Sequence, residues 1–137
     1  MRDHPAAAGE PFDPFLAVRA FHERFDVAIG DRPARQSRAV HELRARLIRE
    51  EAEEVVTALE SGSVAEIASE LADLLYVTYG TAVSLGIDIR PVFDAVHRAN
   101  MAKVGGGRRA DGKVLKPPGW RPADIASVIA AQGGAPD

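Results

Sequence analysis

The sequence lacks features that would point to several classes of protein. It contains no cysteine, which excludes disulfide bridges and thiolate chemistry and leaves oxygen and imidazole groups as the available metal ligands. It has no excess of positive charge, since the formal net charge is −3. A nucleic-acid-binding protein usually carries a strongly basic balance, so we do not expect nucleic acid as a partner.

Long apolar runs are missing as well. The longest run without a charged residue, residues 74–87, is too short to span a bilayer and contains two tyrosines and two glycines. Residues 1–10 have no apolar segment of the kind that forms the centre of a signal peptide. The sequence therefore predicts a cytoplasmic protein with no membrane partner.

What remains is the composition of an ordinary globular domain. The chain has 137 residues, of which 46% are hydrophobic and 27% charged, enough for one domain with one core. We expect a flexible lead-in over residues 1–12, a single helical domain over residues 13–132 and a flexible tail over residues 133–137. No segment is typical of a strand. The predicted class is all-α, a four-helix bundle-like core with an extra C-terminal loop and short helix.

Capping and breaking residues predict where the helices lie. Asp13 followed by Pro14 is typical of a helix start. Ser63, with Glu66 three residues later, forms the pattern of a capping box. Gly and Pro then mark an irregular stretch with a turn at residues 111–112. The first predicted helix starts near residue 13. The four later ones run over about residues 39–60, 63–85, 91–103 and 123–132.

An acidic motif in the second predicted helix is placed against the usual pattern. At about 100° per residue, Glu51 falls near the middle of an apolar arc that includes Leu43 and Leu59. Glu50 and Glu54 lie at the edge of this arc. Unpaired carboxylates are costly in such a position, because burial and mutual repulsion oppose their ionisation. A bound divalent cation such as Mg²⁺, which prefers oxygen ligands, would remove that cost.

The third predicted helix carries a second acidic pair. Glu70 and Asp73 are three residues apart and therefore share a helix face. Glu54 and Glu70 are each eight residues from Gly62, so two antiparallel helices joined there place them at the same height. Five carboxylates are predicted to converge from the two helices.

Plainer interpretations apply to some of these residues. An acidic helix segment is usually a solvated face, and Glu53, on the opposite side of its helix, fits that interpretation. Arg44, Arg46 and Arg49 are most simply ion-pair partners for acids one turn away. A di-iron bundle would need histidine beside the acids. Neither acidic segment contains one.

The spacing Glu50-Glu51-x-x-Glu54 on one helix, followed by Glu70-x-x-Asp73 on the next, resembles the MazG-like all-α NTP pyrophosphatases. Two further segments strengthen the resemblance, the core-helix sequence LADLLYV and the later sequence VHRANMAK. The stretch DGKVLKPPGWRPAD resembles the C-terminal part of a branch described as phosphoribosyl-ATP pyrophosphohydrolase-like, related to dimeric dUTPases.

The resemblance implies an activity and a set of site residues. Its members cleave a nucleoside triphosphate between the α and β phosphates, giving a nucleoside monophosphate and pyrophosphate. Two or three Mg²⁺ (or Mn²⁺) ions would be held by the five carboxylates, with Glu50 or Glu51 acting on the attacking water. The substrate would be bound by Asn100, Lys103, Lys113, Lys116 and His22.

Several of these assignments have alternatives. A lysine at position 103 would also be favoured by the negative end of the helix dipole, without any role in binding. Lys113 and Lys116 would also be ordinary residues of a solvated loop. His22 more often would be a packed residue, and Trp120 either pins the C-terminal loop or stacks on a base. The resemblance implies a homodimer or a tetramer, which agrees with a third helix apolar on many faces. The substrate is left open between dUTP, dCTP and house-cleaning targets. The alternative to an enzyme is a non-catalytic dimerisation or nucleotide-binding regulatory module.

Overall fold

The computed structural model describes residues 11–134, so most of the predicted lead-in and tail lie outside the described residues. Within this range the chain forms helices and no sheet, which confirms the all-α class. The helices are α1 (Pro14–Arg24), α2 (Arg38–Ser61), α3 (Val64–Ser84), α4 (Ile89–Met101) and α5 (Ile125–Ala131). None of the helices in residues 11–134 is long and apolar enough to cross a membrane.

Each helix begins where a short polar side chain caps it. The side-chain oxygen of every cap accepts a backbone N–H of the first turn, which would otherwise have no partner. The five caps are Asp13, Ser37, Ser63, Asp88 and Asp124. The starts predicted at Asp13 and Ser63 are confirmed. The fourth helix begins two residues earlier than predicted because Asp88 caps it, and the fifth begins two residues later because its cap is Asp124.

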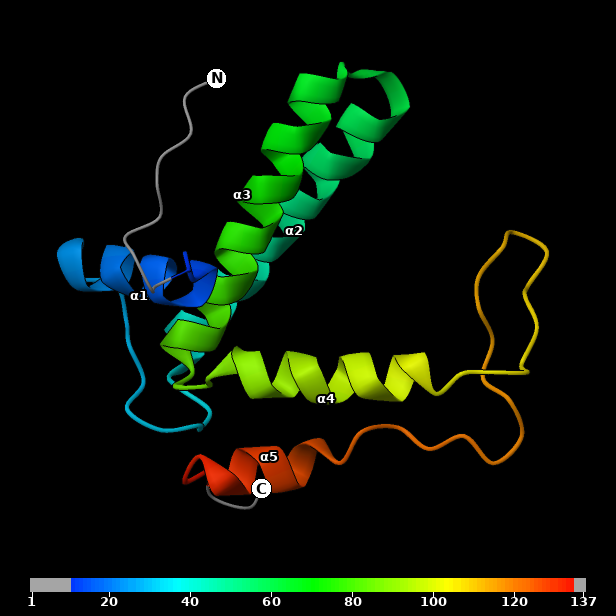
Figure 1. Cartoon of the computed structure of the whole chain (residues 1–137). Helices are drawn as coiled ribbons and strands as arrows, with labels where there is room; N and C mark the ends of the chain where they lie inside the picture. Colours follow the sequence, from blue (N-terminus) through cyan, green and yellow to red (C-terminus); the bar gives the residue numbers. More distant parts are fainter. Residues whose placement is uncertain (1–10, 135–137) are drawn as a thin grey trace.

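The hydrophobic core lies where α1 crosses α3 near the start of α4 (Figure 1). Phe15 and Val18 of α1 are buried against Ala82 and Val83 of α3. The chain turns sharply here, because Gly86 takes a positive φ of 72° and a Cβ on it would collide with the carbonyl of Arg32. Glycine suits this position because it tolerates a positive φ and has no Cβ. This packing fixes the end of the α2–α3 pair that lies opposite the turn at Gly62.

The antiparallel pair of α2 and α3 extends away from the core (Figure 1). Val55 and Ala58 are buried between the two helices. Leu43 and Leu59, predicted to be buried, are instead 42% and 62% exposed. The prediction was wrong for these two because one neighbouring helix covers a narrower part of α2 than the apolar arc.

Arg44 is buried and does not form the predicted ion pair with an acid one turn away. Arg44 is 6% exposed, and its guanidinium donates to the carbonyl of Val77 at 2.9 Å and to Thr81 Oγ1 at 3.2 Å. It packs over Gly80, where a Cβ would lie 2.5 Å from its Nη2 atom. Arg44 therefore fastens α2 to α3 through hydrogen bonds to polar neutral groups.

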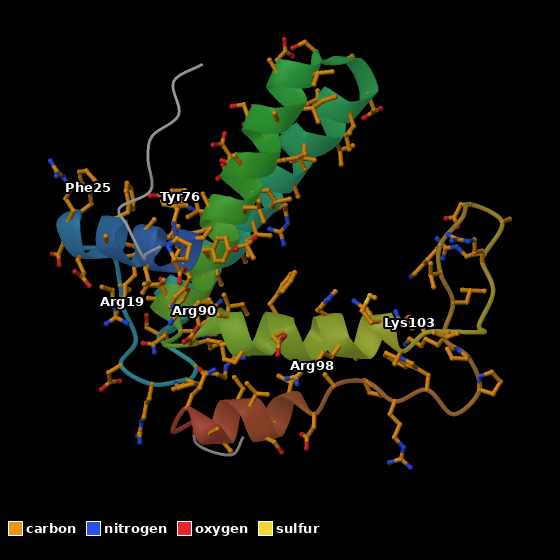
Figure 2. The ribbon with its side chains drawn as sticks, in the orientation of Figure 1. Arg19, Phe25, Tyr76, Arg90, Arg98 and Lys103 are labelled. Carbon is orange, nitrogen blue, oxygen red and sulfur yellow. The ribbon has the colours of Figure 1, made fainter. Side chains whose placement is uncertain are left out.

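The fourth helix diverges from the α2–α3 pair and runs beside α5 (Figure 1). In the described part of the chain, α4 has no buried residue, and Phe93 and Met101 are 71% and 68% exposed. Arg90, which lies at the start of α4 (Figure 2), fixes the first turn of this helix. It forms ion pairs with Asp88 and Asp13, and its guanidinium lies over the ring of Phe15. The predicted C-terminal loop and short helix follow, which confirms that part of the fold.

Candidate metal and active site

The carboxylates lie between α2 and α3, between the core and the turn at Gly62. One ligand oxygen from each of Glu51, Glu70 and Asp73 lies within 4.8 Å of the others, a spacing that suits a shared metal ion. Two of these residues come from α3 and one from α2. The antiparallel pairing therefore brings the two acidic motifs to the same height, as their distances from the turn predict.

Two oxygens in this cluster are buried without a partner. Among the described residues, Glu51 Oε2 and Glu70 Oε2 are the buried side-chain atoms that form no hydrogen bond. A buried polar atom without a partner is costly and calls for an explanation, such as a bound ion. Carboxylate oxygens are the ligands that Mg²⁺ and Mn²⁺ prefer. The residues present thus fit a divalent cation.

Electrostatics give the same account of the cluster. The close approach of the Glu54 carboxyl is the largest cause that raises the pKa of Glu70 to about 7, followed by burial and the charges of Glu54, Asp73 and Glu51. Burial, followed by the charges of Glu54, Asp73 and Glu50, also raises the pKa of Glu51. Like charges held together cannot all ionise without cost, and a cation reverses this repulsion.

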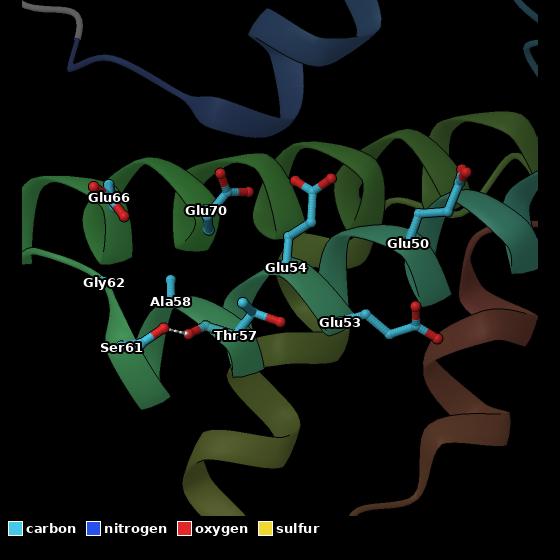
Figure 3. A pocket seen from close by; sticks show the side chains of 9 residues that line it. All are labelled: Glu50, Glu53, Glu54, Thr57, Ala58, Ser61, Gly62, Glu66 and Glu70. Atoms are coloured by element: carbon cyan, nitrogen blue, oxygen red, sulfur yellow. Dashed lines mark hydrogen bonds between the residues drawn. The ribbon is translucent and has the colours of Figure 1, made fainter.

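A groove of about 480 Å³ lies beside the cluster on the side toward the turn. Glu70 belongs to both the cluster and the groove, and Figure 3 shows Glu54 and Glu70 directed to the same side from opposite helices. Glu50 is exposed at one end of this groove. The groove wall is dominated by five glutamates, Glu50, Glu53, Glu54, Glu66 and Glu70. Such a wall can accept a phosphate chain only together with cations that neutralise it.

The predicted substrate-binding residues are not brought to this groove within one chain. Asn100 lies in the last turn of α4, which points away from the α2–α3 pair (Figure 1). Lys103, Lys113 and Lys116 follow in the segment between α4 and α5. His22 is 2% exposed, and its Nδ1 atom lies 3.0 Å from the carbonyl of Ala28. It is held as a packed residue against Gly80, the plainer of its two interpretations.

Two features of the site were missed by sequence reasoning. Thr57 and Ser61 line the groove, whereas the helix-phase count followed only the acidic and apolar residues of this helix. The closeness of Arg44 and His22, which both approach Gly80, was also missed. The signal available in the sequence was Gly80 itself, since a glycine inside a helix often marks a close approach.

The pKa of Glu70 predicts how stability depends on pH in the metal-free protein. The folded state holds the Glu70 proton more tightly than the unfolded state, so its contribution to stability is complete below about pH 4.5 and is lost as the pH rises to about 7. Glu70→Gln should therefore melt near the wild-type temperature at pH 4.5 and above it at pH 7–8. Measuring Tm for both proteins across this range checks the prediction.

The comparison with the variant is needed because His22 acts in the opposite direction. Burial lowers the pKa of His22, so its protonation in the unfolded state weakens the fold as the pH falls. The difference in Tm between wild type and Glu70→Gln removes this shared contribution. MgCl₂ should raise Tm of the wild type more than that of the variant. A Tm difference that stays constant with pH would contradict the assignment of Glu70.

Comparison with known protein families identifies the family of this chain. The search of curated proteins found no match to the chain. The sequence model of the phosphoribosyl-ATP pyrophosphohydrolase family matches residues 18–100, which include both acidic helices and nearly all of α4. Members of this family hydrolyse an anhydride bond of a nucleotide phosphate and are typically metal-dependent. The chain therefore belongs to the phosphoribosyl-ATP pyrophosphohydrolase family, within the MazG-like all-α NTP pyrophosphatase superfamily.

Proposed function

We propose that this protein is a nucleoside triphosphate pyrophosphohydrolase that cleaves its substrate between the α and β phosphates, releasing a nucleoside monophosphate and pyrophosphate. The observation that carries the proposal is the cluster of Glu51, Glu70 and Asp73, in which two buried oxygens have no partner. A site built to hold cations beside an open groove suits a substrate that carries several negative charges.

The roles follow from position. Glu51, Glu54, Glu70 and Asp73 would hold two or three Mg²⁺ or Mn²⁺ ions. When bound, the cations neutralise phosphate charge and lower the pKa of a coordinated water. Glu50 immediately precedes Glu51 on α2 and is exposed, so its carboxylate can orient the attacking water and accept its proton. The proton from the water goes to Glu50, and pyrophosphate leaves with the electrons of the broken P–O bond.

We further propose that the working form is a homodimer, or a tetramer built from such dimers. Phe93, Val96 and Met101 of α4 are exposed in one chain, as are Leu71 and Leu75 of α3. A second copy that covers these faces would also carry Asn100 and Lys103 toward a groove that the first copy's own α4 does not reach. Light scattering coupled to gel filtration measures the mass directly.

A second candidate substrate is phosphoribosyl-ATP itself, because the family model that matches the chain is named for that reaction. The bond cleaved is the same type of phosphoanhydride. The carboxylate cluster suits both substrates equally, since it addresses the phosphates and not the base. A preference for dUTP, dCTP or a damaged nucleotide would have to come from residues outside this cluster.

The test is an assay of pyrophosphate release from phosphoribosyl-ATP and from a panel of canonical and damaged NTPs and dNTPs. Each nucleotide is incubated with MgCl₂, with MnCl₂ and with EDTA, and the nucleotide product is identified by chromatography. We expect metal-dependent release of monophosphate and pyrophosphate, with the ranking of rates naming the substrate. Folded, metal-loaded protein that hydrolyses none of them would favour a non-catalytic regulatory module instead.

A further inference from the structure

The connector that follows α1 is held to the last turn of α3. The backbone N–H of Gly30 donates to the carbonyl of Val83 at 3.0 Å, and the Ser84 hydroxyl donates to the carbonyl of Ala28 at 2.9 Å. Within the connector, Asp26 has a φ of 56°, a left-handed conformation that carries strain in a residue other than glycine. The bend after α1 therefore depends on the contacts that hold it in place.

His22, in the last turn of α1, makes one of these contacts. Its ring is buried, and its Nδ1 atom lies 3.0 Å from the same Ala28 carbonyl that accepts from Ser84. A carbonyl oxygen accepts a hydrogen bond and cannot donate one, so Nδ1 carries the hydrogen of the neutral ring. The other ring nitrogen, Nε2, then has the free lone pair, and it is the atom that takes up a proton when the pH falls.

The Nε2 atom of His22 lies close to a buried cation. A Cβ on Gly80 would be 2.9 Å from His22 Nε2 and 2.5 Å from Arg44 Nη2, so these two nitrogens are at most about 5.4 Å apart, the sum of the two distances. Arg44 is buried as well, and an arginine keeps its charge at every pH at which the protein is folded. A proton on Nε2 would therefore place a second positive charge beside the first, away from water.

No acid in the described part of the chain balances that second charge. Within residues 11–134, His22 forms no ion pair with a carboxylate. The groups around its ring, taken from every element packed there, are Phe21 of α1, Arg44 of α2, Gly80 and Ser84 of α3, and Ala28 of the connector. Burial is the largest cause that lowers the pKa of His22, and the charge of Arg44 lowers it further, against the hydrogen bond to Ala28, which raises it. The closed packing therefore favours the neutral ring.

We propose that His22 is an acid-sensitive latch, which holds the end of α1 and residues 25–30 of the connector against α3 while its ring is neutral and releases them when Nε2 is protonated. Because Nδ1 carries a hydrogen in both states, the ring keeps its bond to Ala28 and moves away from Arg44 together with the connector. The opening breaks the hydrogen bonds between the connector and α3, whereas the far end of the α2–α3 pair stays folded. The latch needs neither nucleotide nor metal, so it is independent of the proposed function.

The direction of the pH effect follows from the state in which His22 binds its proton more tightly. The pKa of His22 is lowered in the closed state and returns toward its ordinary value of 6.5 when the latch opens. The latch is therefore closed most firmly above about pH 6.5 and weakens as the pH falls below that value. Between pH 7.5 and 5.5 the open population should rise several-fold, with about tenfold as the upper limit for a single group of this kind.

Hydrogen exchange of single backbone amides tests the latch, measured by NMR on the full-length protein in EDTA at pH 7.5 and 5.5. The Gly30 amide is the reporter, because its bond to Val83 joins the connector to α3. Its protection factor, which corrects for the intrinsic effect of pH on exchange, should fall several-fold in the wild type. The Gly62 amide, which donates to Ala58 at the far end of the α2–α3 pair, is the internal reference. It should show no loss of protection that depends on His22.

His22→Asn is the decisive variant, because its amide keeps a donor near the position of Nδ1 but cannot take up a proton. The fall in Gly30 protection between pH 7.5 and 5.5 should disappear in this variant, whatever its overall stability. His97→Asn is the matched control, since it makes the same change at an exposed histidine of α4 and should keep the wild-type fall. The titration of the His22 ring in the wild type, followed by NMR, needs no variant and should have its midpoint below pH 6.5.

Three results would overturn the latch. The first is a fall in Gly30 protection that is as large in His22→Asn as in the wild type. The second is a His22-dependent loss of the same size at Gly62, which would mean that the whole fold opens and not the connector alone. The third is a His22 ring that titrates at or above pH 6.5 in the folded protein. None of these measurements uses nucleotide or turnover, so the latch and the proposed function can fail separately.

Discussion

Glu51→Gln is expected to lower the rate of nucleotide hydrolysis by at least about a thousandfold. The substitution keeps the size of the side chain but removes a negative charge and a strong metal ligand from the centre of the cluster. Metal ions contribute several kcal/mol of charge stabilisation in such reactions, and each 1.4 kcal/mol corresponds to a factor of ten in rate. Steady-state assays at saturating Mg²⁺ measure the effect.

The matched control is Glu60→Gln, which makes the same chemical change on the same helix. Glu60 is exposed, near the end of α2, and lies outside both the cluster and the groove. It should retain nearly full activity. A Glu51→Gln variant that is as active as Glu60→Gln would show that the cluster does not hold the metal that acts in the reaction.

Removing the Arg44 side chain should have the largest effect on stability, about 2–4 kcal/mol for Arg44→Ala. The guanidinium donates to Val77 and Thr81 and fills the space between α2 and α3. Burial lowers its pKa, yet arginine stays charged at neutral pH, so these hydrogen bonds are what make the buried position tolerable. Urea denaturation measures the loss in free energy of unfolding.

Gly80→Ala, made both in wild type and in the Arg44→Ala background, tests the same packing a second way. In wild type a Cβ at Gly80 would lie 2.5 Å from Arg44 Nη2 and 2.9 Å from His22 Nε2, so the substitution should destabilise the fold. In the Arg44→Ala background the nearer obstacle is gone. There the methyl group fills part of the void and adds helix propensity of about 1 kcal/mol, so it should cost much less or stabilise. Additive effects of the two substitutions would contradict this packing.

The helices were predicted well from the sequence because N-cap residues, glycines and prolines act on only a few neighbouring residues. Ser63 predicted the start of α3 from its neighbours alone. Helix phase and the distance to the turn at Gly62 were enough to bring Glu51, Glu70 and Asp73 together, since the two helices are consecutive and antiparallel. In a regular helix, the face on which a side chain lies follows directly from its position in the sequence.

Features that depend on separate parts of the chain were not predictable in this way. The i,i+4 rule assigned Arg44 to a nearby acid because it counts only neighbours on the same helix, whereas the partners of Arg44 lie on α3. The exposure of Leu43 and Leu59 depends on how many helices cover α2. The direction of α4 depends on Arg90 and Asp13, which are 77 residues apart. No window of the sequence contains that pair.

The unsatisfied oxygens of Glu51 and Glu70 have a consequence for protein engineering. Any selection for thermal stability carried out without divalent metal will favour substitutions that remove these carboxylates, because each removal relieves burial and repulsion in the empty cluster. Variants enriched in this way would be robust and inactive. A library screened in the presence of Mg²⁺ would keep the acids, since there the same residues contribute binding energy to the folded state.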